Sequence, residues 1–92
     1  MKDRVRAHVF VSGTVQGVFY RVSTRDAARD RKVDGWVKNL PDGRVEAVFE
    51  GTREAVESMI EWCHTGSDRA IVQDVEVSFE EPEKIDGFEI RR

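Results

Sequence analysis

The chain has 92 residues, a length that predicts one domain, over residues 1–92, with a thin hydrophobic core. Its 39% hydrophobic and 36% charged residues exclude a disordered chain, and no apolar run approaches the ~20 residues that span a bilayer. The formal net charge of −3 disfavours nucleic acid as a partner. A charged N-terminus without an apolar continuation argues against a signal peptide.

Cys63 is the only cysteine, which excludes an internal disulfide and a structural zinc cluster of thiolates. A cysteine without a second cysteine to pair with suits a reducing cytoplasm. Cys63 lies on the apolar face of a predicted helix, which indicates a buried, inert thiol. His8 and His64 lack metal-ligand spacing, and the aspartates are scattered. We therefore expect a cytoplasmic protein without a bound metal.

The first half of the chain predicts a strand, a loop, a helix and a second strand. Apolar residues alternate over residues 5–12 with a period of two, as in a half-buried strand. A loop with two glycines occupies residues 13–21. Residues 22–32 contain neither Gly nor Pro and predict a helix with a modest apolar stripe. Residues 33–39 predict the next strand.

The second half begins with a hairpin. Leu40-Pro41-Asp42-Gly43 is a strong turn signal, and residues 45–50 alternate as a strand. Thr52 is suited to cap a helix whose apolar residues recur at helical spacing over residues 55–63. Further strands are predicted over residues 71–79 and, after a charged break, at 88–90.

The predicted order is therefore β-α-β-β-α-β with a short extra strand. Two helices and an antiparallel sheet form two layers, with both helices on one face of the sheet. This is the ferredoxin-like α+β sandwich.

The loop over residues 13–21 has the composition of an anion-binding site. Backbone N–H groups in a tight glycine loop point inward, and a helix N-terminus adds partial positive charge. The Arg21 guanidinium can match phosphate oxygens in pairs. The alternative for Arg21 is a surface ion pair, and the spacing alone does not decide between the two.

Asn39 closes the second predicted strand just before the turn. Its amide can hold a water through the carbonyl oxygen while its NH₂ group bonds elsewhere. In a right-handed β-α-β unit with one strand between, the loop after strand one and the end of strand two can approach each other. The alternative is an asparagine that bonds its own turn.

These residues carry a family resemblance. The segment Gly13-x-Val15-Gln16-Gly17-Val18-x-Tyr20-Arg21 resembles the acylphosphatase pattern G-x-V-Q-G-V-x-F-R, with Tyr20 in place of Phe. Residues 35–39 with the following 40–47, and the ending 87–90, are also similar to that family. One departure is Gly66-Ser67, where the family often has Gly-Pro.

The resemblance implies a hydrolase that cleaves the carboxyl-phosphate bond of small-molecule acyl phosphates. It implies Arg21 and Asn39 as catalytic residues, and a small cytosolic monomer that needs no metal or cofactor. We expect the phosphoryl oxygens to rest on Arg21 and on the backbone N–H groups of Gln16, Gly17, Val18, Phe19 and Tyr20. Asn39 would orient a water for in-line attack, with a substrate oxygen as the proton acceptor.

Other classes of function share the predicted fold. RNA-recognition domains and small-ligand regulatory domains use the same plan, as does an acylphosphatase-like module of larger carbamoyl-transfer proteins. An RNA reader requires aromatic side chains grouped on the open sheet face amid basic residues. Phe10, Trp36 and Phe49 do not all fall on the same face of their predicted strands, which favours core packing over a shared stacking surface. His8 is expected to be solvated.

Overall fold

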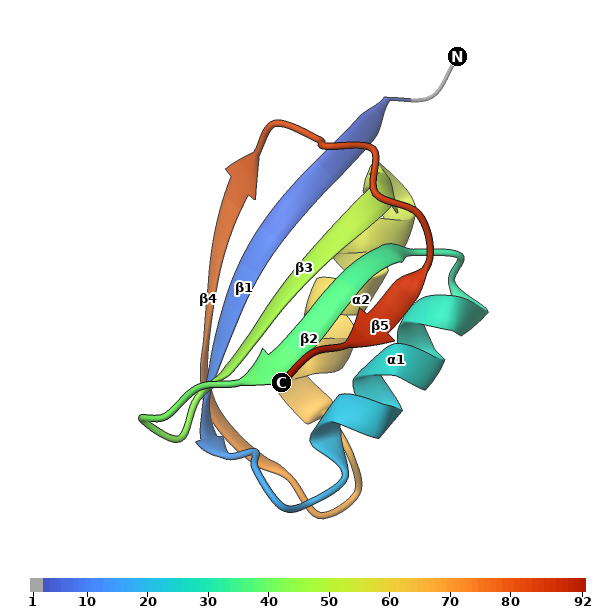
Figure 1. The fold of residues 1–92 in the computed structure, drawn as a ribbon. Helices are drawn as coiled ribbons and strands as arrows, with labels where there is room; N and C mark the ends of the chain where they lie inside the picture. The colour runs from blue at the N-terminus through green and yellow to red at the C-terminus, as the bar shows by residue number, and fades with distance from the viewer. Residues whose placement is uncertain (1–2) are drawn as a thin grey trace.

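The computed structural model describes residues 3–92 and confirms the predicted order of elements (Figure 1). The elements are β1 (Arg4–Thr14), α1 (Tyr20–Asp30), β2 (Asp34–Asn39), β3 (Val45–Thr52), α2 (Arg53–Thr65), β4 (Ile71–Glu80) and β5 (Phe88–Ile90). Neither helix of this described part is long and apolar enough to cross a membrane.

The strands form one five-stranded sheet in the order β4-β1-β3-β2-β5. The pairs β1–β3, β1–β4 and β2–β3 are antiparallel, as predicted. At one edge β5 pairs with β2 in parallel, which the antiparallel prediction missed. The chain leaves β4 at one end of the sheet, crosses that end and turns back beside β2, so β5 follows the direction of β2 (Figure 1).

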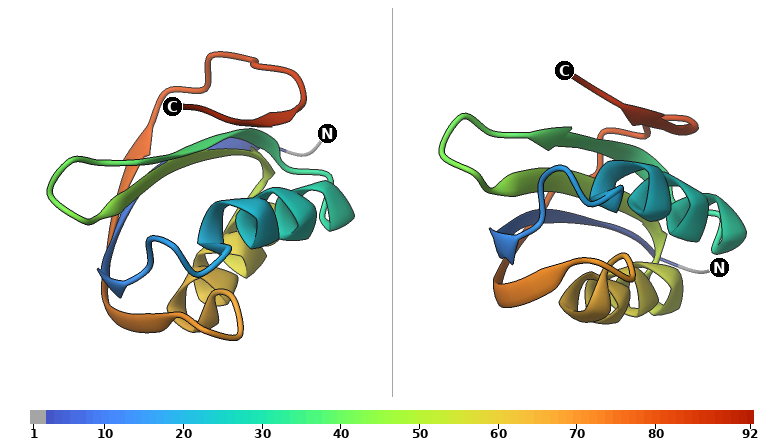
Figure 2. Two further views of the ribbon diagram at one scale, coloured as in Figure 1. Left: turned by 60° about the horizontal axis from the view of Figure 1, so that its bottom comes forward. Right: turned by 90° about the horizontal axis from the view of Figure 1, so that it is seen from below.

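Both helices cover the same face of the sheet, as predicted, and the sheet curves around them (Figure 2). The alternation in β1 decides which face is covered, because its inward residues are buried under the helices. The buried core includes Val5, Ala7, Val9 and Val11 from β1, Ala27 and Ala28 from α1, and Val56, Met59 and Cys63 from α2.

The two helices begin for different local reasons. The Thr52 hydroxyl accepts a hydrogen bond from the Ala55 N–H at 3.2 Å, so the predicted cap of α2 is confirmed. Helix α1 begins at Tyr20, two residues before the predicted start at Val22. Phe19 precedes it in the left-handed conformation, with φ of 62° and no side-chain cap. This backbone turn places Arg21 in the first turn of α1.

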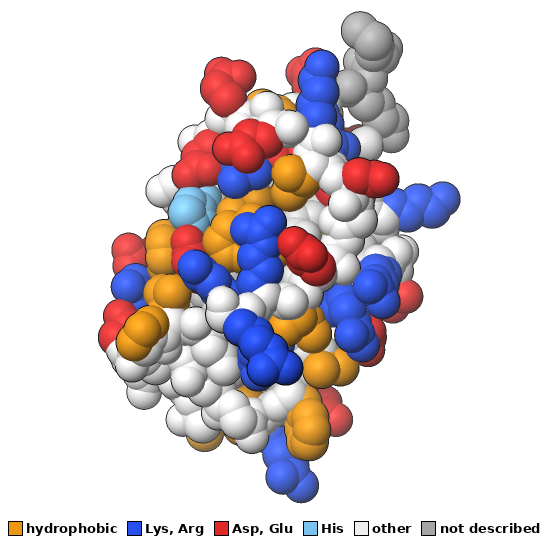
Figure 3. All heavy atoms as spheres, viewed as in Figure 1, with side chains coloured by type: hydrophobic (Ala, Val, Ile, Leu, Met, Phe, Trp, Pro, Cys, Tyr) orange, Lys and Arg blue, Asp and Glu red, His pale blue; other side chains and the backbone are white. Residues whose placement is uncertain are grey.

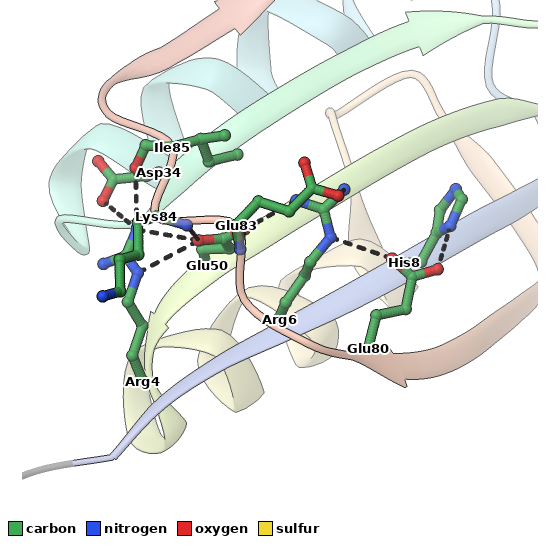
Figure 4. A network of polar contacts seen from close by, with 9 residues as sticks. All are labelled: Arg4, Arg6, His8, Asp34, Glu50, Glu80, Glu83, Lys84 and Ile85. Carbon is green, nitrogen blue, oxygen red and sulfur yellow. Dashed lines mark hydrogen bonds and ion pairs between the residues drawn. The ribbon is translucent and has the colours of Figure 1, made fainter.

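An ionic network around the buried Glu50 holds the segment between β4 and β5 against the sheet (Figure 4). The fully buried Glu50 carboxylate accepts hydrogen bonds from Arg6 Nη1 at 2.7 Å and Arg4 Nε at 3.2 Å. It also accepts the backbone N–H groups of Glu83 and Lys84, at 2.9 and 3.0 Å. Burial alone would raise the pKa of Glu50, but these donors outweigh burial and hold the pKa below its usual range.

The expectation of a solvated His8 is wrong. Its ring lies between two carboxylates, with Nε2 2.6 Å from Glu46 Oε2 and Nδ1 2.8 Å from Glu80 Oε2. Burial alone would lower the pKa of His8, but the two carboxylates outweigh burial and raise it. These carboxylates come from β3 and β4, the strands on either side of β1. The residues next to His8 in the sequence therefore gave no sign of them.

Core packing is confirmed for Phe49 but is wrong for Phe10 and Trp36. Phe49 is fully buried and stacks on Phe88. Phe10 and Trp36 are half-buried, and each contacts the His8 ring, which leaves them on the open face. The guanidinium carbon of Arg44 lies 4.9 Å from the Phe10 ring centroid, and that of Arg91 lies 4.7 Å from a Trp36 ring centroid. Figure 3 shows basic side chains beside hydrophobic ones on the visible face.

Candidate active site

The topology brings the loop after β1 and the end of β2 to one edge of the sheet. β1 and β2 each pair antiparallel with β3 between them, so the two run in the same direction and end together. A cavity of about 240 Å³ opens there. Its lining residues are Val15, Gly17, Phe19, Tyr20, Arg21, Val22 and Asn39.

The structure thus places Arg21 and Asn39 around one cavity, as the predicted β-α-β topology led us to expect. Gly17, Phe19 and Tyr20 line the same cavity, whereas Gln16 and Val18 belong to the loop but are not among its lining residues. We call residues 15–19 the cradle loop. The polar groups that the cradle loop offers to the cavity are those of its backbone.

The cradle loop leaves its N–H groups available. Gly17 has φ of 74° and Phe19 has φ of 62°, so two left-handed residues bend the loop just before α1. Within residues 3–92, the N–H groups of residues 16–20 donate to no protein acceptor. The first N–H groups of a helix also lack intrahelical partners and carry partial positive charge. The loop and the start of α1 therefore suit a negatively charged guest.

The side chain of Gln16 holds the cradle loop to the β2–β3 turn. Its Nε2 donates to the carbonyl oxygens of Leu40 and Arg44, both at 2.8 Å. These two carbonyls flank the turn that directly follows Asn39. One amide group thus fixes the distance between the cradle loop and the strand end that carries Asn39.

A second tether comes from the segment after α2. The Ser67 hydroxyl donates to the Val18 carbonyl at 2.7 Å, at the position where the family often has proline. The Tyr20 hydroxyl donates to the Cys63 carbonyl at 2.9 Å, and burial raises the pKa of Tyr20. A Cβ atom at Gly66 would lie 2.4 Å from the Tyr20 ring, so this close approach requires glycine. The cradle loop is held from two sides without a ligand.

Arg21 is half-buried in the first turn of α1 and lines the cavity. It has no carboxylate partner among the described residues, so the surface ion pair that the sequence left open is not formed there. By contrast, Arg4 and Arg6 are both paired with the buried Glu50. An unpaired guanidinium at a cavity wall is free to bind an anion.

Asn39 carries the one buried polar side-chain atom of residues 3–92 that lacks a hydrogen-bond partner, Oδ1. The turn is closed without this oxygen, because Leu40 N–H donates to the Arg44 carbonyl and Gly43 N–H to the Leu40 carbonyl. An unpaired buried acceptor costs about 1–3 kcal/mol, and native proteins rarely retain one without a role. The structural alternative for Asn39, a bond to its own turn, therefore does not account for this oxygen.

The described part of the chain contains neither a cluster of metal-ligating side chains nor an exposed thiol. Residues 3–92 contain no group of three or more His, Cys, Asp or Glu side chains that could hold a metal ion. Cys63 is buried, as predicted, and burial raises the pKa of its thiol to about 12. A thiol with this pKa is protonated at neutral pH and is a poor nucleophile.

The sequence reasoning missed two residues that adjoin this site. A cavity of about 590 Å³ shares Arg21, Val22 and Asn39 with the first and is completed by Ile90 and Arg92. The available signal was the alternation of side chains along the last residues of the chain, which puts Ile90 of β5 and the following Arg92 on the same side. The pairing of β5 with β2, which brings them here, has no local signature.

The fold and the cavity define a ferredoxin-like α+β domain with an arginine-lined cavity at the edge of its sheet. The family profile described as Acylphosphatase matches residues 7–90. An acylphosphatase of Haloquadratum walsbyi is 76% identical over 91 residues, which are 99% of this chain and 98% of the relative. One of Natronomonas pharaonis is 68% identical over 92 residues, all of both chains.

The same likeness holds among solved structures. An acylphosphatase from Coxiella burnetii superposes with a TM-score of 0.93 at 39% identity, covering 97% of this chain and 94% of that one. The chain belongs to the acylphosphatase family. The resemblance, the ferredoxin-like fold and the expectation of an acylphosphatase hydrolase are confirmed.

Proposed function

We propose that the cavity between the cradle loop and Asn39 hydrolyses acyl phosphates to a carboxylate and inorganic phosphate by in-line attack of water. The observation that carries this proposal is that one cavity is lined both by Arg21, whose guanidinium has no ion-pair partner among residues 3–92, and by Asn39, whose amide has an unpartnered oxygen. One group suits the phosphoryl anion and the other suits a water. The single domain over residues 1–92 contains both.

The phosphoryl group binds to Arg21 and to the backbone N–H groups of the cradle loop and of Tyr20 at the start of α1. Its oxygens accept from the N–H groups of residues 16–20, which lack protein acceptors within residues 3–92. The tethers through Gln16 and Ser67 hold these donors in place before the substrate arrives. Preorganised donors stabilise charge that develops in the transition state more than flexible ones do.

Asn39 positions the attacking water. Rotation about χ2 exchanges its Oδ1 and Nδ2, so the amide can present its acceptor oxygen to a water in the cavity. The water oxygen forms a bond to phosphorus while the bond from phosphorus to the carboxyl oxygen breaks. The carboxylate leaves with the bonding electron pair, and a phosphoryl oxygen receives the proton of the water.

The reaction needs few further groups. A carboxylate is a good leaving group, so it departs without a general acid, and charge stabilisation by Arg21 and the loop suffices. We propose accordingly that the enzyme works without a metal or cofactor, as a cytoplasmic monomer.

Nucleic acid is not part of the proposed function. The guanidinium groups of Arg44 and Arg91 lie over the Phe10 and Trp36 rings, at the faces where bases would stack. Glu46 and Glu80 flank the intervening His8. These features add to the argument from the net charge of −3.

Benzoyl phosphate hydrolysis tests the catalytic assignments. Arg21→Ala should lower kcat/KM by about 10²–10³ and weaken competitive inhibition by phosphate, because it removes a preorganised cation. Asn39→Ala should lower kcat while phosphate inhibition stays nearly unchanged, because it removes a group that acts on the water. Arg69→Ala, which removes an exposed arginine outside the cavity, is the matched control.

Two results would contradict the proposal. Activity of either active-site variant within threefold of the unmodified protein would show that the residue has no catalytic role. Saturable phosphate binding without any turnover of benzoyl phosphate would indicate a regulatory binding module instead. The assay with and without a chelator tests independence from metal ions in the same experiment.

A further inference from the structure

Arg92 lies beside Asn39 because of the parallel pairing between β5 and β2. In that register Gly35 faces Phe88, Trp36 faces Glu89 and Val37 faces Ile90. The Arg91 N–H donates to the Val37 carbonyl at 2.8 Å, so the pairing continues beyond Ile90. Beyond this bond the chain brings Arg92 to the end of β2, where Arg92 and Asn39 line one cavity.

Successive side chains of extended backbone point to opposite faces, so Arg92 lies on the side of the helices and Arg91 on the other side. Phe88 is buried and stacks on Phe49 in the core, on the covered face of the sheet. Ile90 and Arg92 share that side and line one cavity with Arg21 and Val22 of α1. Arg91 instead lies over Trp36 on the open face and pairs with Glu89 at 3.0 Å.

The charge of this cavity differs from that of its neighbours. Arg21 and Arg92 both line it, no Asp or Glu does, and neither arginine side chain has an ion-pair partner among residues 3–92. Three other cavities each include carboxylates together with basic residues. In a chain of net charge −3, two unpaired guanidinium groups at one cavity mark a place for more than one negative charge.

The cavity is also larger than a phosphoryl group needs. It is an open cavity of about 590 Å³ and adjoins the cavity of about 240 Å³ at the cradle loop through Arg21, Val22 and Asn39. Val22 and Ile90 give it an apolar wall. An acyl phosphate bound by its phosphoryl group at the cradle loop can extend its acyl group along this wall toward Arg92.

We infer that Arg92 forms a second anion subsite that favours acyl phosphates whose acyl group carries its own negative charge. The inference rests on the proposed function, since it requires the phosphoryl group at the cradle loop. A distal carboxylate or phosphate would pair with Arg92 in the ground state and in the transition state alike. Such uniform binding lowers KM and leaves kcat nearly unchanged.

Matched substrates test this inference. We would compare 4-carboxybenzoyl and 3-carboxybenzoyl phosphates with their methyl counterparts, which have a similar shape without the distal charge. The unmodified protein should favour at least one carboxyl substrate by about fivefold or more in kcat/KM, through KM, as one partly exposed ion pair allows. Arg92→Gln should abolish that preference, and Arg92→Lys should retain part of it.

Arg91→Gln is the matched control, because it removes the neighbouring charge on the opposite side of the strand. It should keep the preference for the carboxyl substrate. The inference is overturned if the unmodified protein shows no preference, or if Arg92→Gln affects both substrates of a pair equally. The latter result would place Arg92 on the phosphoryl group itself or in a purely structural role.

Failure of the proposed function has a separate signature. If the protein does not hydrolyse the methyl-substituted substrates, or if Arg21→Ala hydrolyses them as well as the unmodified protein does, the cradle loop is not the phosphoryl site. Both the proposed function and the subsite would then be wrong. If the methyl-substituted substrates are cleaved and their cleavage requires Arg21, the proposed function stands. The ratio of kcat/KM between the carboxyl and methyl substrates then tests the subsite alone.

Discussion

Replacement of Gln16 by alanine tests whether the cradle loop must be held in place to act. The Gln16 side chain makes two hydrogen bonds of 2.8 Å, to the Leu40 and Arg44 carbonyls, from a half-buried position. Each such bond contributes about 0.5–1.5 kcal/mol net, so the two contribute about 1–3 kcal/mol. Loss of this amount between the loop and the turn should lower kcat/KM by roughly 5- to 150-fold, at tenfold per 1.4 kcal/mol.

The assay combines benzoyl phosphate kinetics, inhibition by inorganic phosphate and urea unfolding. Gln16→Ala should lose activity and phosphate affinity together, because the cradle loop loses its fixed distance to Asn39. Gln16→Glu has nearly the same shape but, when ionised, no donor for the two carbonyls, and should lose at least as much. Gln73→Ala removes an exposed glutamine of β4 and should change neither property.

A Gln16→Ala protein with kcat/KM within twofold of the unmodified protein would refute this reasoning. A Gln16→Glu protein with normal activity would do the same, since it would show that the two hydrogen bonds are not required. Reduced stability with normal activity would mean that the tether supports the fold but not the geometry of the site.

Two other contacts lead to predictions of their own. Ser67→Ala removes the hydroxyl that donates to the Val18 carbonyl at 2.7 Å and should lower the free energy of unfolding by about 1 kcal/mol. It should also raise the inhibition constant of phosphate, and an unchanged constant would argue against this second tether. His8, with its pKa raised by Glu46 and Glu80, stabilises the fold fully below its unfolded pKa of about 6.5. That contribution is lost as the pH rises through the folded pKa, so urea midpoints should fall as the pH rises above about 6.5, and His8→Gln should remove this slope. An equal slope in His8→Gln would assign the pH dependence to another group.

Local patterns predicted the elements, and the topology predicted the site. The Thr52 cap, the hairpin turn over residues 40–43 and the apolar spacing of α2 each depend on residues within one turn or two of each other. The order of strands then placed Arg21 and Asn39 at the same edge of the sheet. These features required no knowledge of how distant strands align.

The features that sequence reasoning missed depend on long-range register or on unusual backbone. His8 meets Glu46 and Glu80 only after β1 has paired with β3 and β4. Arg92 and Asn39 line one cavity only because β5 pairs in parallel with β2, a pairing that the antiparallel prediction did not include. The early start of α1 follows from the left-handed Phe19, a conformation that a residue other than glycine seldom adopts.

An NMR titration of the ¹⁵N-labelled protein with inorganic phosphate tests the central claim, that the cradle loop and Arg21 form a phosphoryl receptor before substrate arrives. The account predicts saturable shifts that are largest at the amides of residues 16–20 and at the Arg21 guanidinium, and their loss in Arg21→Ala. Saturable shifts that centre on another part of the molecule, with these amides unmoved, would contradict it.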